Sequence, residues 1–372
     1  PIHIKIQGNV LPVNQQVMLP DMIEKMAYEL MTPDQIKTFE STLEMNLSFG
    51  VQQVGNFRIN IFRQRGSISI VVRFILGNIP ELESLELPPI LNDLVMEKRG
   101  LILIVGATGS GKSTTIASML DHRNTNRAGH ILTVEDPIEY LFRHKKSIVN
   151  QREIGLDTLD WQAALKNAMR QAPDCILIGE IRDKETMQAA IGYSQTGHLC
   201  LATLHANNSY HALNRIISFF PLENRPALFL DLSVALRAIV SQRLVRKLDG
   251  KRTPTCEVML NTRHISELID RGEVQAIKEA MEQTMAPGSQ TFEQDLFRLY
   301  REGKISLDEA LANADSPTNL SWLINNAEIA PSGGKEEKRS NPTLEFDTTN
   351  ATGASFKDFA LSLADDEDEP AR

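Results

Sequence analysis

The sequence predicts an α/β protein in which a parallel sheet, covered by helices on both faces, follows a smaller α+β domain. Four continuous apolar runs, each separated from the next by a polar turn and an amphipathic segment, carry this prediction: 101–105, 130–134, 175–179 and 199–204. Uninterrupted apolar runs of this kind are typical of strands that are buried on both faces. With 372 residues, the chain has room for two domains and a tail.

The first 78 residues are expected to form the smaller domain. "HIKIQGNVLPV" has the alternation of a strand, residues 20–31 have a helical pattern, and "TPDQIKTFESTL" predicts a helix capped by Thr32. "VQQVGNFRINIFRQRGSISIVVRFI" at 51–75 predicts a three-strand meander with glycines at its two turns. Because a strand pattern is already present at Pro1, we expect the native protein to begin before this residue.

The rest of the chain is divided by changes in composition. Prolines in 79–90 predict a linker, and the sheet domain is expected at 91–325. Its second half is predicted to be helical over 227–247 and then in shorter pieces. Residues 326–372 are polar, rich in Gly, Ser and Thr, and carry five consecutive acids, so we predict a disordered acidic tail.

Composition and charge exclude several classes of protein. Ten acids and five bases in 331–372 account for −5 of the net charge of −9, which leaves the other 330 residues near −4. Such a chain has no basic footprint for nucleic acid. No apolar run reaches the ~18 residues of a membrane span, so only peripheral contact with a membrane is expected. The three cysteines form no Cys-x-x-Cys pair, and we expect reduced thiols rather than a zinc site.

A phosphate-binding loop is predicted at 106–113. "GATGSGKS" fits GxxxxGK[ST], follows the apolar run "LILIV" and opens the helical pattern "STTIASMLDH". Glycines allow successive backbone N–H groups to face phosphate oxygens, and the helix N-terminus adds partial positive charge. Lys112 is expected to reach the β- and γ-phosphates and Ser113 to bind Mg²⁺. The predicted nucleotide-binding residues of this loop are Gly106, Ala107, Thr108, Gly109, Ser110, Gly111, Lys112, Ser113 and Thr114.

Two further segments place acids at the ends of predicted strands. "CILIGEIRD" presents Glu180, where we expect an acid that acts on Mg²⁺ through a bound water. "ILTVEDPIEY" presents Glu135, Asp136 and Glu139, which suit a metal site, a general base or only a solvated strand end. Because ligands of parallel sheets lie beyond the carboxyl ends of the strands, this turn is expected beside the phosphates. Which acid orients the attacking water stays open on these grounds alone.

Together with "GHLCLATLHANNS", these segments occur in the order and spacing of the type II/IV secretion ATPases, and residues 1–325 resemble that family. The resemblance implies a RecA-like P-loop ATPase domain after a PAS-like N-terminal domain, assembled as a hexameric motor. The family's catalytic base corresponds to Glu139, which leaves Glu135 as an acid on the metal side and Asp136 as a structural acid.

The same resemblance assigns roles to two histidines and two arginines. His198 and His205 fall in the family's histidine segment, with His198 expected at the nucleotide and His205 as a catalytic sensor of the γ-phosphate. Without the resemblance, each histidine would be expected to be packed and hydrogen-bonded. The family's two N-terminal arginines correspond to Arg58 and Arg73, which are expected to share one face of neighbouring strands and to act in catalysis.

Within the family, the chain resembles the branch that retracts type IV pili and drives twitching motility. It lacks the four-cysteine insertion usual in extension and secretion members. The retraction motif AIRNLIRE is degraded to "HISELIDR" at 264–271, which resembles accessory retraction ATPases. The resemblance implies three partners: other copies of the chain, a paralogous retraction ATPase and an inner-membrane platform protein. It also implies a cytoplasmic location at the base of the pilus machine. The alternatives are an extension or secretion motor, and an interaction subunit that binds nucleotide with little turnover.

Overall fold

The computed structural model describes residues 1–329 apart from 7–8, 52–53, 76 and 285. Residues 1–326 form one compact unit. The predicted acidic tail lies outside the described residues from residue 330 onward. None of the described helices combines the length and the apolar composition needed to cross a membrane.

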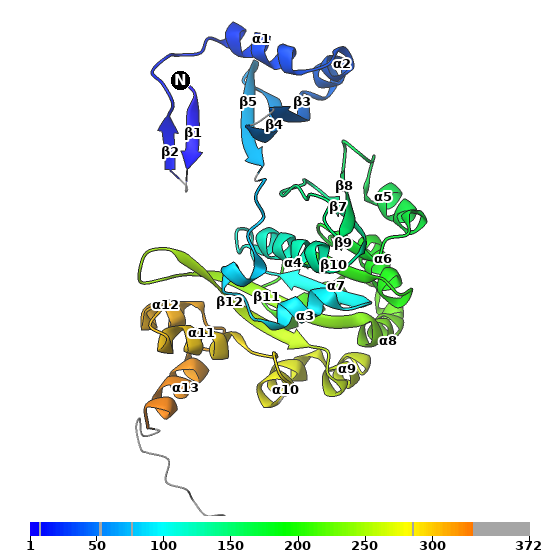
Figure 1. Ribbon diagram of the computed structural model, residues 1–372, viewed down its shortest axis with the longest axis vertical. Helices are drawn as coiled ribbons and strands as arrows, with labels where there is room; N and C mark the ends of the chain where they lie inside the picture. The colour runs from blue at the N-terminus through cyan, green and yellow to red at the C-terminus, as the bar shows by residue number, and fades with distance from the viewer. Residues whose placement is uncertain (7–8, 52–53, 76, 285, 330–372) are drawn as a thin grey trace, which may run out of the picture. The chain divides into compact units, whose positions relative to one another are not determined.

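A seven-stranded sheet is the framework of the larger part of this unit (Figure 1). Its order is β12-β11-β6-β10-β9-β7-β8, and every neighbouring pair is parallel except β11 and β12. The bounds are β6 Gly100–Val105, β7 Gly129–Glu135, β8 Ser147–Glu153, β9 Cys175–Ile178, β10 Leu199–Leu204, β11 Leu236–Arg246 and β12 Arg252–Leu260. The predicted α/β class with a mainly parallel sheet is confirmed.

Helices cover both faces of the sheet. Leu101 and Leu103 of β6 belong to a core that includes residues of α5 to α10, whereas Ile102 and Ile104 belong to a core shared with α3 and α4. Strand alternation therefore sends successive side chains into two separate cores. The helices are α3 Ile90–Met96, α4 Lys112–Asn126, α5 Trp161–Ala168, α6 Lys184–Gln195, α7 Ser209–Ser218, α8 Arg225–Ala235, α9 Arg263–Asp270 and α10 Ile277–Gln283.

The prediction of a helix over 227–247 is wrong for the second half of that segment. The helix α8 ends at Ala235, and residues 236–246 form β11, which pairs with β6 on one side and β12 on the other. The segment "LRAIVSQRLVR" is apolar enough to continue a helix, but two neighbouring strands supply its backbone hydrogen bonds. Three more helices follow, packed around Phe292, and they are α11 Phe292–Arg301, α12 Leu307–Asn313 and α13 Pro317–Ile329.

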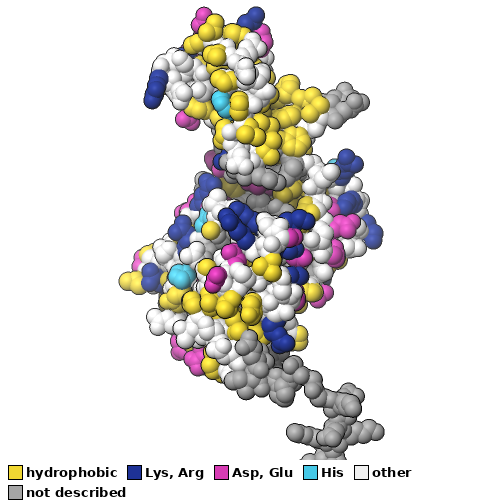
Figure 2. All heavy atoms as spheres, turned by 90° about the vertical axis from the view of Figure 1, so that its left-hand side faces the viewer, with side chains coloured by type: hydrophobic (Ala, Val, Ile, Leu, Met, Phe, Trp, Pro, Cys, Tyr) yellow, Lys and Arg dark blue, Asp and Glu magenta, His cyan; other side chains and the backbone are white. Residues whose placement is uncertain are grey.

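The N-terminal part combines two helices with an antiparallel three-stranded sheet. Thr32 forms the predicted capping box, and the meander begins at Glu44 rather than at residue 51. Several apolar side chains here are exposed, Phe49 and Phe74 among them, and Figure 2 shows hydrophobic side chains gathered over this part. The elements are β1 His3–Ile6, β2 Asn9–Pro12, α1 Pro20–Leu30, α2 Pro33–Thr42, β3 Glu44–Val51, β4 Gly55–Gln64 and β5 Ser67–Ile75.

The register of this small sheet fixes where the two predicted arginines lie. Arg58 of β4 is directly opposite Arg73 of β5, so the two side chains leave the same face of the sheet. Ile59 and Ile61, which alternate with Arg58, are buried in a core with residues of α1 and α2. The arginines therefore lie on the face that the helices leave open.

Candidate nucleotide-binding and catalytic site

The loop between β6 and α4 has the backbone that phosphate binding needs. Gly111 has a φ of +91°, and a Cβ on Gly106 would come within 2.5 Å of the carbonyl oxygen of Gln242, so both positions favour glycine. The Gln242 side chain braces the loop from β11. Its amide donates to the Ser110 carbonyl (2.8 Å) and accepts from the Thr115 hydroxyl (2.7 Å). No local sequence pattern predicts this contact between β11 and the loop.

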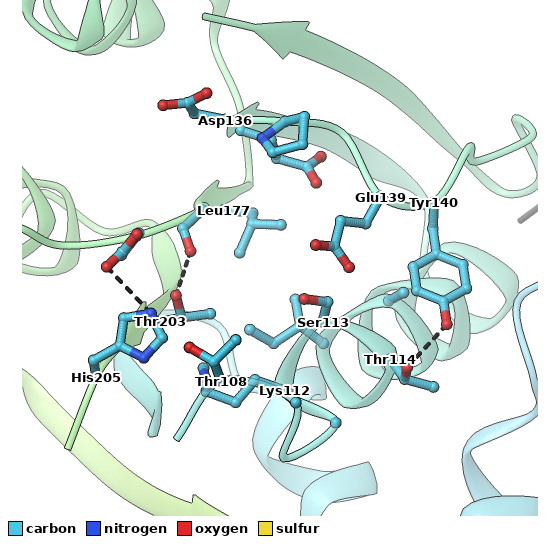
Figure 3. A pocket seen from close by; sticks show the side chains of 18 of the residues that line it. Thr108, Lys112, Ser113, Thr114, Asp136, Glu139, Tyr140, Leu177, Thr203 and His205 are labelled. Atoms are coloured by element: carbon cyan, nitrogen blue, oxygen red, sulfur yellow. Dashed lines mark hydrogen bonds and ion pairs between the residues drawn. The ribbon is translucent and has the colours of Figure 1, made fainter. Parts of the chain in front are cut away.

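A cavity of about 530 Å³ lies over this loop (Figure 3). It brings together the phosphate loop, the acidic turn after β7 and the ends of β9 and β10. The predicted site residues that line it are Thr108, Gly109, Gly111, Lys112, Ser113, Thr114, Glu135, Glu139, Glu180 and His205. Asp136 also lines it, and so do Tyr140 and Thr203, which no sequence pattern singles out.

Lys112 is the first residue of α4 and lies at the floor of the cavity. Its Nζ donates to the carbonyls of Gly106 (2.8 Å) and Ala107 (2.9 Å). Burial lowers the pKa of Lys112, and the nearby carboxylates of Glu180 and Glu139 act in the opposite direction. Since the positive end of the α4 dipole lies at the same place, the floor of the cavity suits a polyphosphate.

Glu180 and His205 interact on one wall of the cavity. The Glu180 carboxylate accepts from Arg182 Nε at 2.7 Å, and its other oxygen lies 3.4 Å from His205 Nε2. Thr203 stabilises the same wall, because its hydroxyl donates to the carbonyl of Gly179, the residue before Glu180. Glu180 is therefore placed at the cavity by two partners, and the position of His205 is linked to it.

The acidic turn directs its three carboxylates differently. Glu139 points into the cavity above Lys112 and Ser113, whereas Asp136 points away from them (Figure 3). Asp136 lies 3.5 Å from Arg182 in an ion pair. Glu135 accepts from the hydroxyl of Thr133 (2.6 Å) and the amide of Gln151 (3.3 Å). Of the three, Glu139 has the position suited to aim a water at a bound phosphate.

The described residues contain no group of three His, Cys, Asp or Glu side chains arranged to hold a metal by themselves. Mg²⁺ at nucleotide sites is usually held by one or two protein oxygens together with water and phosphates. The cavity offers oxygens of that kind on Ser113, Glu180 and Glu135. The donor set therefore fits a magnesium ion that arrives with a nucleotide.

Glu135 predicts a pH dependence of stability. Burial raises the pKa of Glu135 from 4.5 to about 7, although Thr133 and Gln151 oppose the shift. Between these two values the folded protein binds a proton that the unfolded chain has released. The free energy of unfolding should therefore fall as pH rises from about 4.5 to 7, by on the order of 3 kcal/mol. Denaturant unfolding of the protein and of Glu135→Gln between pH 4.5 and 8 measures it.

Glu135→Gln should lose this component of the slope and be relatively more stable than the parent at pH 8. Asp34→Asn, a change on the exposed first turn of α2, serves as the control and should keep the slope. Parallel curves for the parent protein and Glu135→Gln would contradict the assignment.

Six predicted residues do not line this cavity. Three of them, Gly106, Ala107 and Ser110, belong to the same loop as Lys112, and the other three are His198, Arg58 and Arg73. His198 precedes β10, where its Nδ1 lies 3.2 Å from the Tyr193 carbonyl. The length of that strand, roughly 20 Å, separates it from His205, so His198 is excluded from the cavity of its own chain. Arg58 binds Glu153, Arg73 is exposed, and neither lines the cavity.

Comparison with known proteins supports the predicted resemblance. The family model described as "Type II/IV secretion system protein" matches residues 44–286. The type IV pilus ATPase PilU of Pseudomonas aeruginosa is 47% identical over 325 residues, which are 87% of this chain and 85% of that protein. The type IV pilus retraction ATPase PilT of the same organism is 37% identical over 320 residues, 86% of this chain and 93% of that protein.

A solved structure agrees with these matches. The crystal structure of the pilus retraction motor PilT with bound ADP has a TM-score of 0.80 and 40% identity, and the match covers 86% of this chain and 92% of that one. The predicted resemblance, including its retraction branch, is confirmed. The chain belongs to the type II/IV secretion system protein family, with pilus-retraction ATPases among its close relatives.

Proposed function

We propose that this chain is a Mg²⁺-dependent ATPase that hydrolyses ATP to ADP and phosphate and powers or assists the retraction of type IV pili. One observation carries the proposal: a single cavity holds the phosphate loop together with Glu139, Glu180 and His205. The relative with bound ADP supports a nucleotide as the occupant of that cavity.

Each group then has one task in hydrolysis. The loop N–H groups and Lys112 bind the phosphates, and Glu139 orients the attacking water and accepts its proton. Ser113, Glu180 and Glu135 would hold a magnesium ion, which would neutralise charge on the phosphates. His205 pairs with Glu180. Its position, and with it that of the turn after β10, changes with the presence or absence of the γ-phosphate.

The proposed assembly is a homohexameric ring on the cytoplasmic side of the inner membrane, at the base of the pilus machine. Hydrolysis would change the relation between the two parts of each subunit and so act on an inner-membrane platform protein. The similarity to PilU and PilT supports this setting. PilT itself is the proposed partner ATPase.

The altered retraction motif supports an accessory role. It falls on α9, where Ile265, Leu268 and Ile269 are buried in the main core. Ser266 stands where the motif has its first arginine, and its hydroxyl donates to the Ser233 carbonyl at 2.9 Å. Asp270 replaces the second arginine. The helix therefore keeps its packing role and loses two cationic groups, which supports work beside a partner that retains them.

Glu139→Gln should lower kcat by about 10²–10⁴-fold, because the amide cannot accept a proton from the attacking water. Binding of ATP should change little, since this contribution is made in the transition state. Steady-state hydrolysis of Mg-ATP and titration with a fluorescent ATP analogue measure the two quantities separately. Asp136→Asn, which alters the acid of the same turn that points away from Lys112 and Ser113, is the matched control and should retain most of the activity.

If Glu135→Gln is inactive while Glu139→Gln turns over normally, the base is Glu135 and the assignment is wrong. The same assay, run with size determination and with or without PilT, tests the proposed function itself. A chain that binds ATP and forms rings without turnover in either condition would be an interaction subunit instead.

A further inference from the structure

We propose that Glu153 is a positioning residue that, together with Arg58, holds the turn presenting Glu139 to the nucleotide. The inference rests on the proposed function, because it concerns the same catalytic carboxylate. It assigns to Arg58 a task inside its own chain, distinct from direct contact with the phosphates.

Glu153 lies beside the acidic turn because of the sheet register. It is the last residue of β8, directly opposite Glu135, the last residue of β7. One oxygen of its carboxylate accepts the backbone N–H of Ile138 at 3.0 Å. Ile138 immediately precedes Glu139, so this bond fixes the backbone from which the Glu139 side chain extends.

The other oxygen of Glu153 accepts from Arg58 Nη1 at 2.9 Å. The two side chains are only 5% and 18% exposed, respectively. A carboxylate this deeply buried stays charged only where cations or N–H donors compensate it. Asp157 steadies the same residue by accepting its backbone N–H at 2.8 Å.

The pairing also accounts for two arginines standing directly opposite each other. Like charges at such positions of an antiparallel pair are destabilising. Glu153 neutralises Arg58, whereas Arg73 makes no ion pair among the described residues. The two arginines therefore have different environments, and Arg58 has an anionic partner that is already part of the protein.

The consequence for catalysis is geometric. A displacement of about 1 Å in a catalytic group costs on the order of 10²-fold in rate. Without the charge pair, Glu153 loses its fixed position and the Ile138 amide loses its acceptor. Glu139 would then keep its carboxylate but be displaced from the attacking water, which lowers kcat more than it changes KM.

The test uses the full chain with Glu153→Gln, Arg58→Ala, Arg58→Lys and the double variant Arg58→Ala/Glu153→Gln. Each of the first two should lower kcat by about 10–100-fold with KM for ATP within about threefold of the parent. Because the residues act as one unit, the double variant should be no slower than the slower single variant. Arg58→Lys, which keeps a cation, should recover part of kcat.

A matched control comes from the same strand. Arg63 of β4 pairs with Glu40 at 3.0 Å and alternates with Arg58 onto the opposite face, so Arg63→Ala should leave kcat unchanged. Melting temperatures of all variants identify any that are unfolded at the assay temperature. If Glu153→Gln is unfolded there, the comparison between Arg58→Ala and Arg58→Lys decides, because both keep the carboxylate.

Mixing subunits provides an independent arm. If Arg58 serves the Glu139 turn of its own chain, Arg58→Ala subunits mixed with Glu139→Ala subunits should show no recovery of activity. Recovery on mixing, a normal kcat in either folded single variant, or multiplicative losses in the double variant would each overturn the inference. A parent protein that hydrolyses no ATP would instead overturn the proposed function.

Discussion

Replacing Lys112 with alanine should remove ATP binding and reduce hydrolysis below detection, the largest effect that we expect from any single change. The ammonium group is the fixed cation at the floor of the cavity, where it is held by the carbonyls of Gly106 and Ala107. Loss of one preorganised donor to a developing charge costs about 10²–10³-fold in rate, and loss of ground-state phosphate binding adds to it.

Titration with a fluorescent ATP analogue, followed by steady-state turnover, checks both parts of this prediction. Lys98→Ala, which removes an exposed lysine before β6, is the control and should bind and turn over as the parent does. Lys112→Arg keeps the charge but not the compact shape of the ammonium group, so it should also be impaired. Unchanged affinity in Lys112→Ala would reject the phosphate loop as the nucleotide site.

The parts of the fold that could be predicted are those in which local pattern and tertiary environment agree. The runs 101–105 and 199–204 are apolar, short and bounded by turns, and they become the buried strands β6 and β10. The sequence predicts a helix over 236–246, wrongly, because the apolar residues of this segment follow α8 without a glycine or proline between them. Pairing with β6 and β12 determines its structure, and these partners are distant in sequence.

The site shows the same division. A loop whose function needs glycines and a lysine at fixed spacing can be recognised from the residues themselves, and six of its nine predicted members line one cavity. Gln242 and Glu153 could not be chosen, because neither has a distinctive neighbour in the chain and both act through a contact with a distant segment. The distance of His198 from the cavity could not be predicted for a related reason, since β10 has two ends and only the end that precedes His205 reaches the cavity.

Replacing Arg73 with alanine should leave ATP binding intact and lower kcat by about 10³–10⁵-fold, the range typical of an arginine that stabilises charge on the transferred phosphoryl group. Arg73 is exposed, lies directly opposite Arg58 and makes no ion pair among the described residues. An unneutralised cation beside another cation is unfavourable within one subunit. An anion supplied from outside the small sheet would compensate it, and in the proposed ring the nucleotide of a neighbouring subunit would be such an anion.

Mixing identifies the subunit on which Arg73 acts. Arg73→Ala subunits retain Glu139, and Glu139→Ala subunits retain Arg73, so a randomly mixed ring with equal amounts of both has about a quarter of its interfaces with an intact pair. Activity should rise above that of either variant alone and be highest near equal proportions, with subunit exchange verified by energy transfer between labelled chains. Because Arg58 is expected to act on Glu139 of its own chain, the Arg58→Ala mixture should show no gain over the residual activity of Arg58→Ala subunits alone. Recovery with Arg73→Ala but not with Arg58→Ala would mean that Arg73 acts at the site of a neighbouring subunit and Arg58 at the site of its own subunit. No recovery with Arg73→Ala would mean that both arginines act at the site of their own subunit.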